Sequence, residues 1–319
     1  MNTAPSIAVI DIGSTRIRYA SATPDGPGNI HTEPTRPAHL LSQLTEIVER
    51  LAETTSIEAV SISTTGLVDA KRGIISEFDT PDGETLRDLP VAETIESQLN
   101  LPTKVENDCT AAALGEDTFG AGHEYSTVVH VTFGTGIGAG VVVDGEPIRG
   151  ERGFAAEVGL FPIVADGDLW STDVRGAWEA YCSGRGIAQF ATHELALDER
   201  DSLLRDSDSL TAPDVFDAAA EGDPLAQSCL DRIARYNAAG IGAIVNAFDP
   251  GIITLGGSVA LKNPEWILGG IHEHIDDYVL ADPPTIELTA LGADIELYGA
   301  TANYFDATKT QPVPKPRTD

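Results

Sequence analysis

Two distant segments of the chain share one plan, in which a short apolar strand enters a glycine-containing turn and leaves as a second strand. The first segment runs from Ile7 to Ala20 and the second from Val128 to Val143. The first turn groups one acidic residue with small and polar ones: Asp11, Gly13, Ser14 and Thr15. The second turn is richer in glycine: Gly134, Thr135, Gly136 and Gly138. A repeated supersecondary plan predicts a duplicated unit, with one copy in each of two domains.

The second turn does not match the known nucleotide-binding fingerprints. A dinucleotide-binding turn opens into a helix, whereas the residues after Gly138 continue as an apolar strand from Val141 to Val143. The lysine of a P-loop is also missing. Glycines leave backbone N–H groups open to an anion, although a hairpin that binds nothing has the same pattern. The presence of two such turns favours phosphate binding.

Strands and helices alternate along the chain, which predicts an α/β architecture. Helical spacing of apolar residues or helix-forming composition covers residues 39–53, 91–99, 213–220 and 224–248. Short apolar runs predict strands at residues 60–63, 103–106 and 252–255. The last of these strands ends in Gly256 and Gly257.

Two acidic residues follow predicted strands closely. Asp11 leaves its strand into the turn, where a carboxylate can hold Mg²⁺ through water beside the phosphates of ATP, or serve as an Asx-turn acceptor. Asn107 and Asp108 lie between a strand and an alanine-rich helix, and either could cap that helix. Asp108 could also act as general base toward a sugar hydroxyl, because phosphoryl transfer needs a carboxylate near the attacking oxygen. Both roles are compatible, since a helix N-terminus favours an ionised acid.

The charge of the chain limits its partners. It contains 50 acidic and 20 basic residues, and its formal net charge of −30 disfavours binding to nucleic acid. The acids occur in every segment, so they are expected to maintain solubility in a salt-rich, halophilic cytosol. Three widely spaced cysteines predict neither a disulfide framework nor a metal cluster, which favours the reducing cytoplasm. We recognise neither a signal peptide nor a membrane-spanning run.

Taken in order, the motifs resemble the ROK family of sugar kinases, a branch of the actin, hexokinase and Hsp70 superfamily. Residues 10–17 resemble its first phosphate motif, and residues 133–140 resemble the second. Residues 106–116 resemble the segment that holds the sugar and the base, and residues 255–258 resemble the adenosine motif. Residues 298–300 resemble the start of the C-terminal helix. The resemblance covers nearly the whole chain.

The resemblance implies a two-domain actin-like ATPase (ribonuclease H-like) fold, with duplicated βββαβα units and a cleft between the domains. It implies an N-terminal domain at residues 1–118, with residues 297–319 packing back on it, and a C-terminal domain at 119–296. ATP and Mg²⁺ are the implied cofactors, and a homodimer or higher homo-oligomer is the implied assembly. Both turns, together with Gly256 and Gly257, are implied to bind the nucleotide.

The resemblance also implies roles for the sugar site. Asp108 resembles the catalytic base, and Asn107 resembles a ligand of the sugar hydroxyls. Glu157 and Glu179 resemble two sugar-binding glutamates, and Gly66 lies in a segment implied to bind the sugar. Carboxylates and amides suit this task because each can bind two hydroxyls. The alternative for both glutamates is solvated surface, against which their glycine-flanked, mostly apolar surroundings argue.

The departures from the family pattern concern its zinc loop. Leu160 stands where the family has a zinc-binding histidine, and residues 169–177 contain none of its usual cysteines. The sequence therefore predicts no zinc site, with Trp170 and Trp178 holding the loop by packing. Thr65 stands where the family usually has proline, so these departures affect the choice of substrate more than phosphoryl transfer.

Three functions compete. The leading one is phosphorylation of a hexose, above all glucose, to the hexose 6-phosphate. The second is a kinase for an N-acetylhexosamine, and the third is a sugar-sensing or catalytically weak sugar-binding protein. ROK repressors carry a DNA-binding segment ahead of the first strand, whereas this acidic chain reaches that strand at Ile7. Retention of Asp11, Asp108 and both glycine turns favours an active kinase.

Overall fold

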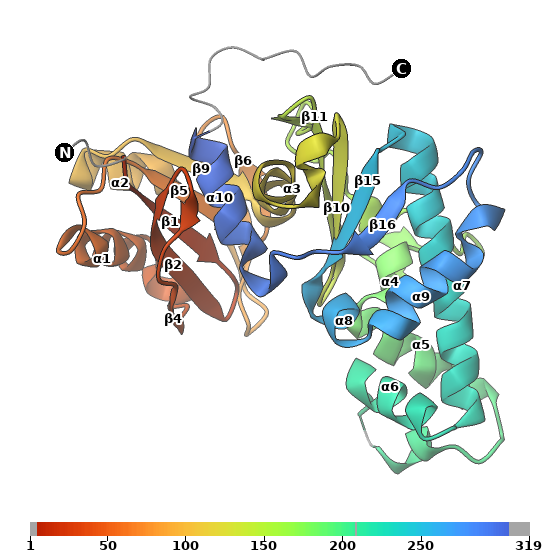
Figure 1. Ribbon diagram of the computed structural model, residues 1–319. Helices are drawn as coiled ribbons and strands as arrows, with labels where there is room; N and C mark the ends of the chain where they lie inside the picture. The colour runs from red at the N-terminus through yellow and green to blue at the C-terminus, as the bar shows by residue number, and fades with distance from the viewer. Residues whose placement is uncertain (1–4, 208, 306–319) are drawn as a thin grey trace. The chain divides into compact units, whose positions relative to one another are not determined.

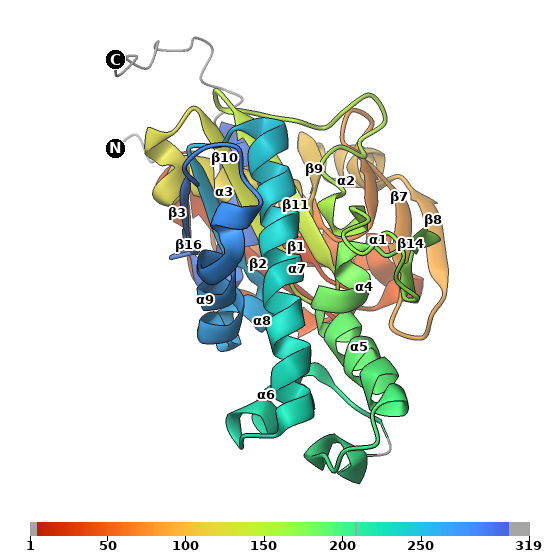
Figure 2. The ribbon, with the colours of Figure 1, turned by 90° about the vertical axis from the view of Figure 1, so that its right-hand side faces the viewer.

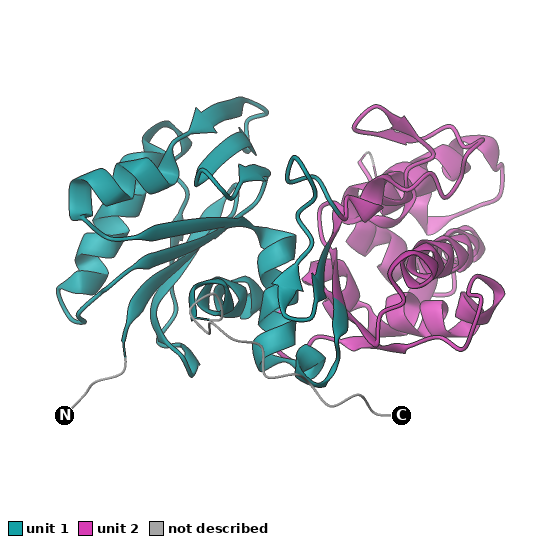
Figure 3. Cartoon of the chain, turned by 90° about the horizontal axis from the view of Figure 1, so that it is seen from above, with its two compact units in different colours: residues 1–128, 140–155, 293–319 teal, residues 129–139, 156–292 magenta. Residues whose placement is uncertain are grey.

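The structure is a computed structural model that describes residues 5–207 and 209–305. These residues form two compact units, shown in different colours in Figure 3. Unit 1 takes in the described parts of residues 1–128, 140–155 and 293–319, and unit 2 those of residues 129–139 and 156–292. Residues 306–319, part of the segment expected to pack back on the N-terminal domain, lie outside the described part of the chain.

A six-stranded sheet forms the centre of unit 1 (Figure 1), with the strand order β3-β2-β1-β5-β9 and with β4 paired to β2. Its strands are β1 (Ile7–Ile12), β2 (Arg16–Thr23), β3 (Gly26–Pro27), β4 (His31–Pro34), β5 (Val60–Thr64) and β9 (Thr103–Asn107). β1 and β2 form an antiparallel hairpin, whereas β1, β5 and β9 run parallel. This order brings the carboxyl ends of three parallel strands to one edge of the sheet.

The longer helices of unit 1 are α1 (Leu40–Ala52), α2 (Val91–Leu99), α3 (Asp108–Phe119) and α10 (Ile295–Phe305). Side chains alternate along β1, so that Ile10 lies in the core with α1 and α2 while Ile7 and Val9 pack with Leu297 of α10. The two helices predicted between the strands are confirmed to within one residue at each end.

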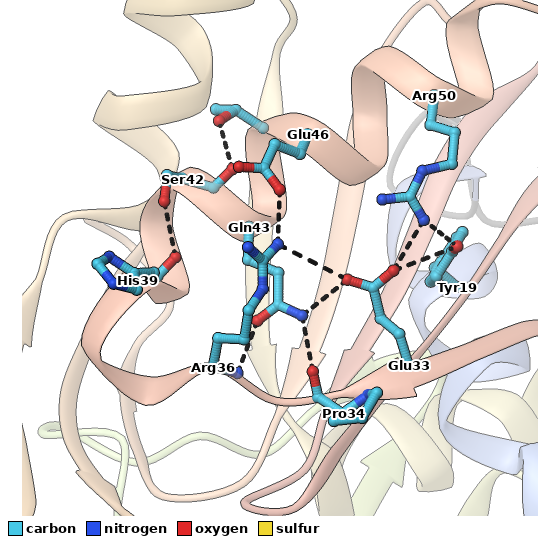
Figure 4. A network of polar contacts seen from close by, with 10 residues as sticks. Tyr19, Glu33, Pro34, Arg36, His39, Ser42, Gln43, Glu46 and Arg50 are labelled. Carbon is cyan, nitrogen blue, oxygen red and sulfur yellow. Dashed lines mark hydrogen bonds and ion pairs between the residues drawn. The ribbon is translucent and has the colours of Figure 1, made fainter.

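A polar network holds α1 against the edge of this sheet (Figure 4). Glu33 of β4 accepts hydrogen bonds from Gln43 Nε2 and from Arg50 Nη1, each at 2.7 Å. Arg50 also donates to the hydroxyl of Tyr19 on β2. Partial burial would raise the pKa of Glu33, but the hydrogen bonds from Arg50 and Gln43, together with the charges of Arg50 and Arg36, lower it on balance. The network thus fixes α1 to β2 and β4.

Glycine allows α3 and α10 to pack closely. α10 begins at Ile295, so that residues 298–300 lie inside the helix and not at its start, as the sequence had predicted. A Cβ atom at Gly299 would lie 1.8 Å from the carbonyl oxygen of Ala111 in α3. The backbones of the two helices are therefore in contact, and this contact fixes the position of α3.

Three strands that the sequence pattern did not reveal form a separate sheet in unit 1: β6 (Leu67–Asp69), β7 (Ile74–Asp79) and β8 (Thr85–Leu89). Ile75 and Phe78 of β7 lie in the hydrophobic core, whereas β8 is largely exposed. The segment lacks a clean apolar and polar alternation, because its two core residues are three positions apart.

A second sheet follows the order β12-β11-β10-β15-β16. Its strands are β10 (Thr127–Phe133), β11 (Ile137–Val143), β12 (Glu146–Pro147), β15 (Ile252–Gly256) and β16 (Thr285–Leu288). The two sheets have the same plan. In the first, the hairpin of β1 and β2 lies beside β5 and then β9; in the second, the hairpin of β10 and β11 lies beside β15 and then β16. The duplicated plan and the α/β class predicted from the sequence are therefore confirmed.

The second glycine turn is shorter than predicted. β10 continues to Phe133 and β11 begins at Ile137, so that Gly138 and Gly140 lie in a strand. A Cβ atom at Gly140 would lie 2.2 Å from the carbonyl oxygen of Cys109. Gly140 is thus required for the close approach of α3 and not for the turn.

Unit 2 is largely helical, and its helices include α4 (Trp178–Cys182), α5 (Gly184–Leu197), α6 (Ala212–Ala220), α7 (Pro224–Phe248), α8 (Gly257–Lys262) and α9 (Pro264–His274). The long helix α7 runs beside α4, α5 and α9 (Figure 2). Its start follows the sequence signal, since Asp223 accepts hydrogen bonds from the backbone N–H groups of Leu225 and Ala226, and Pro224 occupies the first helical position.

Short 3₁₀ helices link these elements at Pro37–His39, Ala121–Glu124, Val158–Leu160, Leu203–Asp206, Ile275–Asp277 and Gly292–Asp294. Over residues 5–207 and 209–305, we find no helix whose length and apolar character would let it cross a membrane.

Candidate functional site

One row of residues across the unit 1 sheet is polar. The strand register places Asp11 of β1 beside Arg18 of β2 and Ser63 of β5, and Ser63 beside Glu106 of β9. Asp11 lies inside β1, and not after it as predicted, and alternation directs it to the face that carries α10. Asp11 is 7% exposed and Glu106 is 3% exposed. Acidic side chains this deeply buried require partners.

Arg18 is the partner of Asp11. Its Nη2 and Nε atoms lie 2.7 and 3.1 Å from Asp11 Oδ2. The same guanidinium reaches Glu296 Oε2 at 2.8 Å and Asp294 Oδ1 at 3.4 Å, both near the start of α10. Burial raises the pKa of Asp11, although Arg18 opposes the shift. Burial, together with the negative charge of Asp11, raises the pKa of Glu296 to about 7.

Glu296→Gln is expected to flatten the dependence of folding stability on pH between about 4.5 and 7. The pKa of Glu296 is about 7 in the folded protein and 4.5 in its ordinary state, so between these values the folded form holds a proton that the unfolded form has lost. The stability due to this group is therefore complete below pH 4.5 and is lost as the pH rises through 7. Urea denaturation of both proteins across this range measures the difference, and parallel curves would contradict the assignment.

Asn107 and Asp108 lie where β9 gives way to α3, and the structure separates their roles. Asn107 Oδ1 accepts hydrogen bonds from the N–H groups of Cys109 at 3.0 Å and Thr110 at 3.2 Å, so Asn107 is the helix cap. Asp108 is the first residue of α3, and its Oδ1 accepts from Cys109 N–H at 2.8 Å. Asp108 is half-buried at the N-terminus of the helix, the positive end of its dipole.

Gly66 lies next to this pair. Asn107 Nδ2 donates to the Gly66 carbonyl at 3.3 Å. Gly66 has a φ of +92°, and a Cβ atom there would lie 2.1 Å from the carbonyl oxygen of Glu77. Only glycine fits such a position. Three of the predicted sugar-site residues, Gly66, Asn107 and Asp108, therefore lie together in unit 1.

The turn after β1 is tightly held. Gly13 N–H donates to the Arg16 carbonyl at 3.0 Å, and Thr35 Oγ1 donates to the Gly13 carbonyl at 2.7 Å. Ser14 is half-buried and Thr15 is exposed at the tip. Both backbone polar groups of Gly13 are therefore engaged, and Ser14 and Thr15 form the tip of the turn.

Asp11 fits a magnesium ion held through water. Both hydrogen bonds from Arg18 reach Oδ2, so direct chelation by the two carboxylate oxygens would require Arg18 to leave. One carboxylate oxygen is enough for a water-mediated contact, because Mg²⁺ commonly keeps several waters and takes its other ligands from substrate phosphates.

Unit 2 brings its own predicted nucleotide residues together. Gly134 N–H donates to the Gly136 carbonyl at 3.0 Å, and Gly184 N–H at the start of α5 donates to the Gly134 carbonyl at 2.8 Å. Gly257 has a φ of +80°, and a Cβ atom there would lie 2.3 Å from the carbonyl oxygen of Phe133. The second glycine turn, with Thr135 exposed at its tip, therefore contacts the turn formed by Gly256 and Gly257.

The two predicted sugar-binding glutamates also lie in unit 2. Glu179 Oε2 accepts a hydrogen bond from Ile137 N–H at 3.0 Å, which attaches Glu179 to the second glycine turn. Glu157 is exposed and follows Ala156, whose φ of +63° is unusual for a residue with a side chain. Partial desolvation, and then the charge of Glu179, raise the pKa of Glu157. The two carboxylates are thus close enough to interact.

The segment that replaces the family's zinc loop is a hairpin of β13 (Trp170–Ser171) and β14 (Val174–Arg175). Trp170 is 57% exposed, so the prediction that it holds the loop by packing is wrong. Trp178 is buried and its Nε1 donates to Asn237 Oδ1 at 2.8 Å in the core of the unit. Side chains of α4 hold the loop instead.

Glu179 and Tyr181 of α4 each bind the replaced loop. Ser171 Oγ donates to Glu179 Oε1 at 2.5 Å, and Leu169 N–H donates to the Tyr181 hydroxyl at 3.1 Å. Sequence reasoning assigned no role to Ser171 or Tyr181, because their contacts join a loop and a helix that meet only in the folded unit. In residues 5–207 and 209–305 we find no group of three or more His, Cys, Asp or Glu side chains placed to hold a metal ion.

The purified protein is expected to carry no zinc. Leu160 offers no ligand atom, and hydrogen bonds to α4 already fix the hairpin that replaces the cysteine loop. Elemental analysis after dialysis measures the metal content. About one tightly held zinc per chain, with loss of folding on chelation, would contradict the expectation.

Comparison with known proteins places these residues in a family. A model of the ROK family matches residues 7–302. A glucokinase from Streptomyces coelicolor is 31% identical over 294 residues, which cover 85% of this chain and 91% of that protein.

Two solved structures share the fold. A ROK hexokinase from Thermus thermophilus matches 96% of this chain and all of its own, with a TM-score of 0.85 and 29% identity. A ROK family glucokinase from Streptomyces griseus, crystallised with glucose and AMPPNP, matches 93% of this chain and 98% of its own, with a TM-score of 0.74 and 30% identity.

Proposed function

The chain belongs to the ROK family, and we propose that this protein is an ATP-dependent sugar kinase that converts glucose to glucose 6-phosphate. The glucokinase and hexokinase relatives support the activity. One observation carries the proposal within this chain. Asn107 caps α3, which leaves Asp108 as an acid at the N-terminus of that helix, beside the Gly66 turn.

In the proposed reaction the oxygen of the sugar 6-hydroxyl attacks the γ-phosphorus of ATP, and Asp108 takes the proton of that hydroxyl. A new bond forms between that oxygen and phosphorus, the bond to the bridging oxygen of ADP breaks, and ADP carries away the electron pair. The transfer needs mainly positioning and charge stabilisation, so a held carboxylate is enough. The amide of Asn107 and the carboxylates of Glu157 and Glu179 would bind other hydroxyls. Glu179 accepts two protein hydrogen bonds but retains acceptor capacity.

The nucleotide residues come from both units. The N–H groups of Gly13 and Gly134 are engaged within their turns, so the phosphates would be bound by the N–H groups at the turn tips, those of Ser14 and Thr15 in the first turn and of Thr135 and Gly136 in the second. The Gly256–Gly257 turn would hold the adenosine. Mg²⁺, held through water by Asp11, would offset phosphate charge when bound.

An N-acetylhexosamine kinase is the second candidate. Leu160 and the hairpin from Trp170 to Arg175 differ from the pattern of the family beside Glu157 and Glu179, so the sugar end of the site is where this chain departs most. An apolar leucine at position 160 in place of a histidine would fit a sugar with an N-acetyl group better than one with a hydroxyl at that place.

A coupled ADP-release assay separates the candidates. Glucose, mannose, N-acetylglucosamine and N-acetylmannosamine are each tested with ATP and Mg²⁺ at high potassium chloride. A kcat/KM highest for glucose supports the first proposal, and a higher value for an N-acetylated sugar supports the second. Sugar binding without ADP release from any of the four would refute both kinase proposals.

We also propose that the protein works in the cytoplasm of a halophilic cell, in sugar catabolism such as glycolysis. Its three cysteines are free thiols, and its net charge is −30. Salt shortens the range of charge repulsion from about 10 Å at 0.1 M to about 3 Å at 1 M. Melting temperature and activity are therefore expected to rise between 0.1 and 2 M potassium chloride, and a melting temperature that falls with salt would contradict this.

A further inference from the structure

A cavity in unit 1 adjoins the residues proposed to bind the sugar. Its volume is about 340 Å³, and Asn107 and Thr110 form part of its wall. The segment from Arg149 to Ala155, which follows β12, also lines the cavity. Gly153 in that segment has a φ of +81°, and a Cβ atom there would lie 2.8 Å from the carbonyl oxygen of Val68. The segment is therefore seated closely on the start of β6.

Arg149 joins this segment to the central sheet. Its Nε and Nη2 atoms lie 2.7 and 2.6 Å from Glu106 Oε2, and Glu106 is 3% exposed. The other carboxylate oxygen, Oε1, accepts a hydrogen bond from the backbone N–H of Asn107 at 3.1 Å. One carboxylate thus binds the guanidinium of Arg149 through one oxygen and the backbone of Asn107, the residue that caps α3, through the other.

The cost of this arrangement argues for a role beyond folding. A buried ion pair loses the hydration of both charges, and apolar replacements are often as stable. Burial raises the pKa of Glu106, although Arg149 opposes that shift. An apolar pair would also fill this place, whereas this chain has a charged pair there, directly before Asn107.

We propose that Arg149 is a positioning residue for sugar binding, which acts through Glu106 to fix Asn107 and to hold the 149–155 segment beside the cavity. The inference rests on the proposed function, since it takes Asn107 as a sugar ligand. Arg149 itself touches no reacting atom. Its loss should weaken the sugar complex more than the nucleotide complex, because a shift of about 1 Å in a positioned group can cost about 10²-fold.

The test compares four variants with the wild type: Arg149→Met, Arg149→Lys, the double variant Glu106→Gln with Arg149→Met, and Arg50→Met. Arg50→Met is the matched control, because it breaks another Arg–Glu pair of the same unit, between Arg50 on α1 and Glu33 on β4 (Figure 4). KM for glucose, KM for ATP and kcat are measured by ADP release. Glucose affinity is measured by calorimetry, and folding by melting temperature.

Arg149→Met is expected to raise the KM and Kd for glucose by about 10- to 100-fold, with KM for ATP changed less than about 3-fold. Arg149→Lys keeps the charge but only one contact, so it should be intermediate. The double variant removes the unpaired buried charge and should recover melting temperature without recovering glucose affinity. Arg50→Met should leave glucose affinity unchanged.

Two results would overturn the positioning role: glucose affinity that recovers together with melting temperature in the double variant, or equal losses for glucose and ATP in Arg149→Met. Failure of the proposed function is a different result, since the wild type itself would then release no ADP with any sugar. In that case glucose calorimetry still decides whether Arg149 positions a sugar ligand.

Discussion

Asp108→Asn is expected to lower turnover at saturating glucose and ATP by about 10²- to 10⁴-fold, which is the usual contribution of a general base. The substitution keeps the shape of the side chain and an oxygen that can accept from Cys109 N–H. It removes the group that takes the proton from the attacking hydroxyl. Steady-state kinetics measure the loss, and calorimetry is expected to show glucose affinity close to that of the wild type.

Folding stability should change by less than about 1 kcal/mol in Asp108→Asn, because asparagine keeps an oxygen that can accept from Cys109 N–H and a charge at a helix N-terminus typically contributes no more than that. The cap itself belongs to Asn107, whose Oδ1 accepts from two backbone N–H groups. Asn107→Ala is the contrasting variant, since losing the cap should cost about 1 kcal/mol of stability and should also weaken sugar binding. Turnover of Asp108→Asn near the wild-type value would remove Asp108 from the mechanism.

Local sequence signals predicted the elements that carry these residues. α7 begins with an aspartate cap followed by proline, as its sequence indicates. The spacing of apolar residues predicted α1 with bounds that differ from the observed ones by one residue at each end. The repeated strand, turn and strand led to the two related sheets. Such signals succeed because caps, turns and amphipathic faces act within a few residues of one another.

Contacts between side chains that are far apart in the sequence could not be predicted. Alternation on β2 could have placed Arg18 on the same face as Asp11, but Glu296 is 278 positions away from Arg18 and reaches it only because α10 packs beside β1. Arg149 and Glu106 likewise meet only in the folded unit. The sequence also left the cap open between Asn107 and Asp108, because both residue types cap helices equally well.

Gly299→Ala is expected to destabilise the protein by about 3 kcal/mol and to lower its melting temperature by about 6 to 12 °C. The added Cβ would lie 1.8 Å from the Ala111 carbonyl oxygen, a backbone atom that no side-chain rotation can move. α10 would have to move away from α3, and Leu297 and Ala300 would then lose their packing against β1. Calorimetric melting of the purified variant measures the effect.

Gly269→Ala provides the matched control, because it makes the same change within the helix α9, at an exposed position where the nearest atom to the new Cβ is 3.9 Å away. It should stabilise the protein by about 0.4 to 1 kcal/mol, since alanine restricts the unfolded chain without a clash. Only Gly299→Ala should also reduce turnover, because α3 begins at Asp108 and a displaced helix carries that carboxylate out of line with the sugar hydroxyl. Equal stability changes in the two variants would show that the close contact between α3 and α10 is not needed for stability. The position of Asp108 would then depend on the cap at Asn107 and not on the contact between the helices.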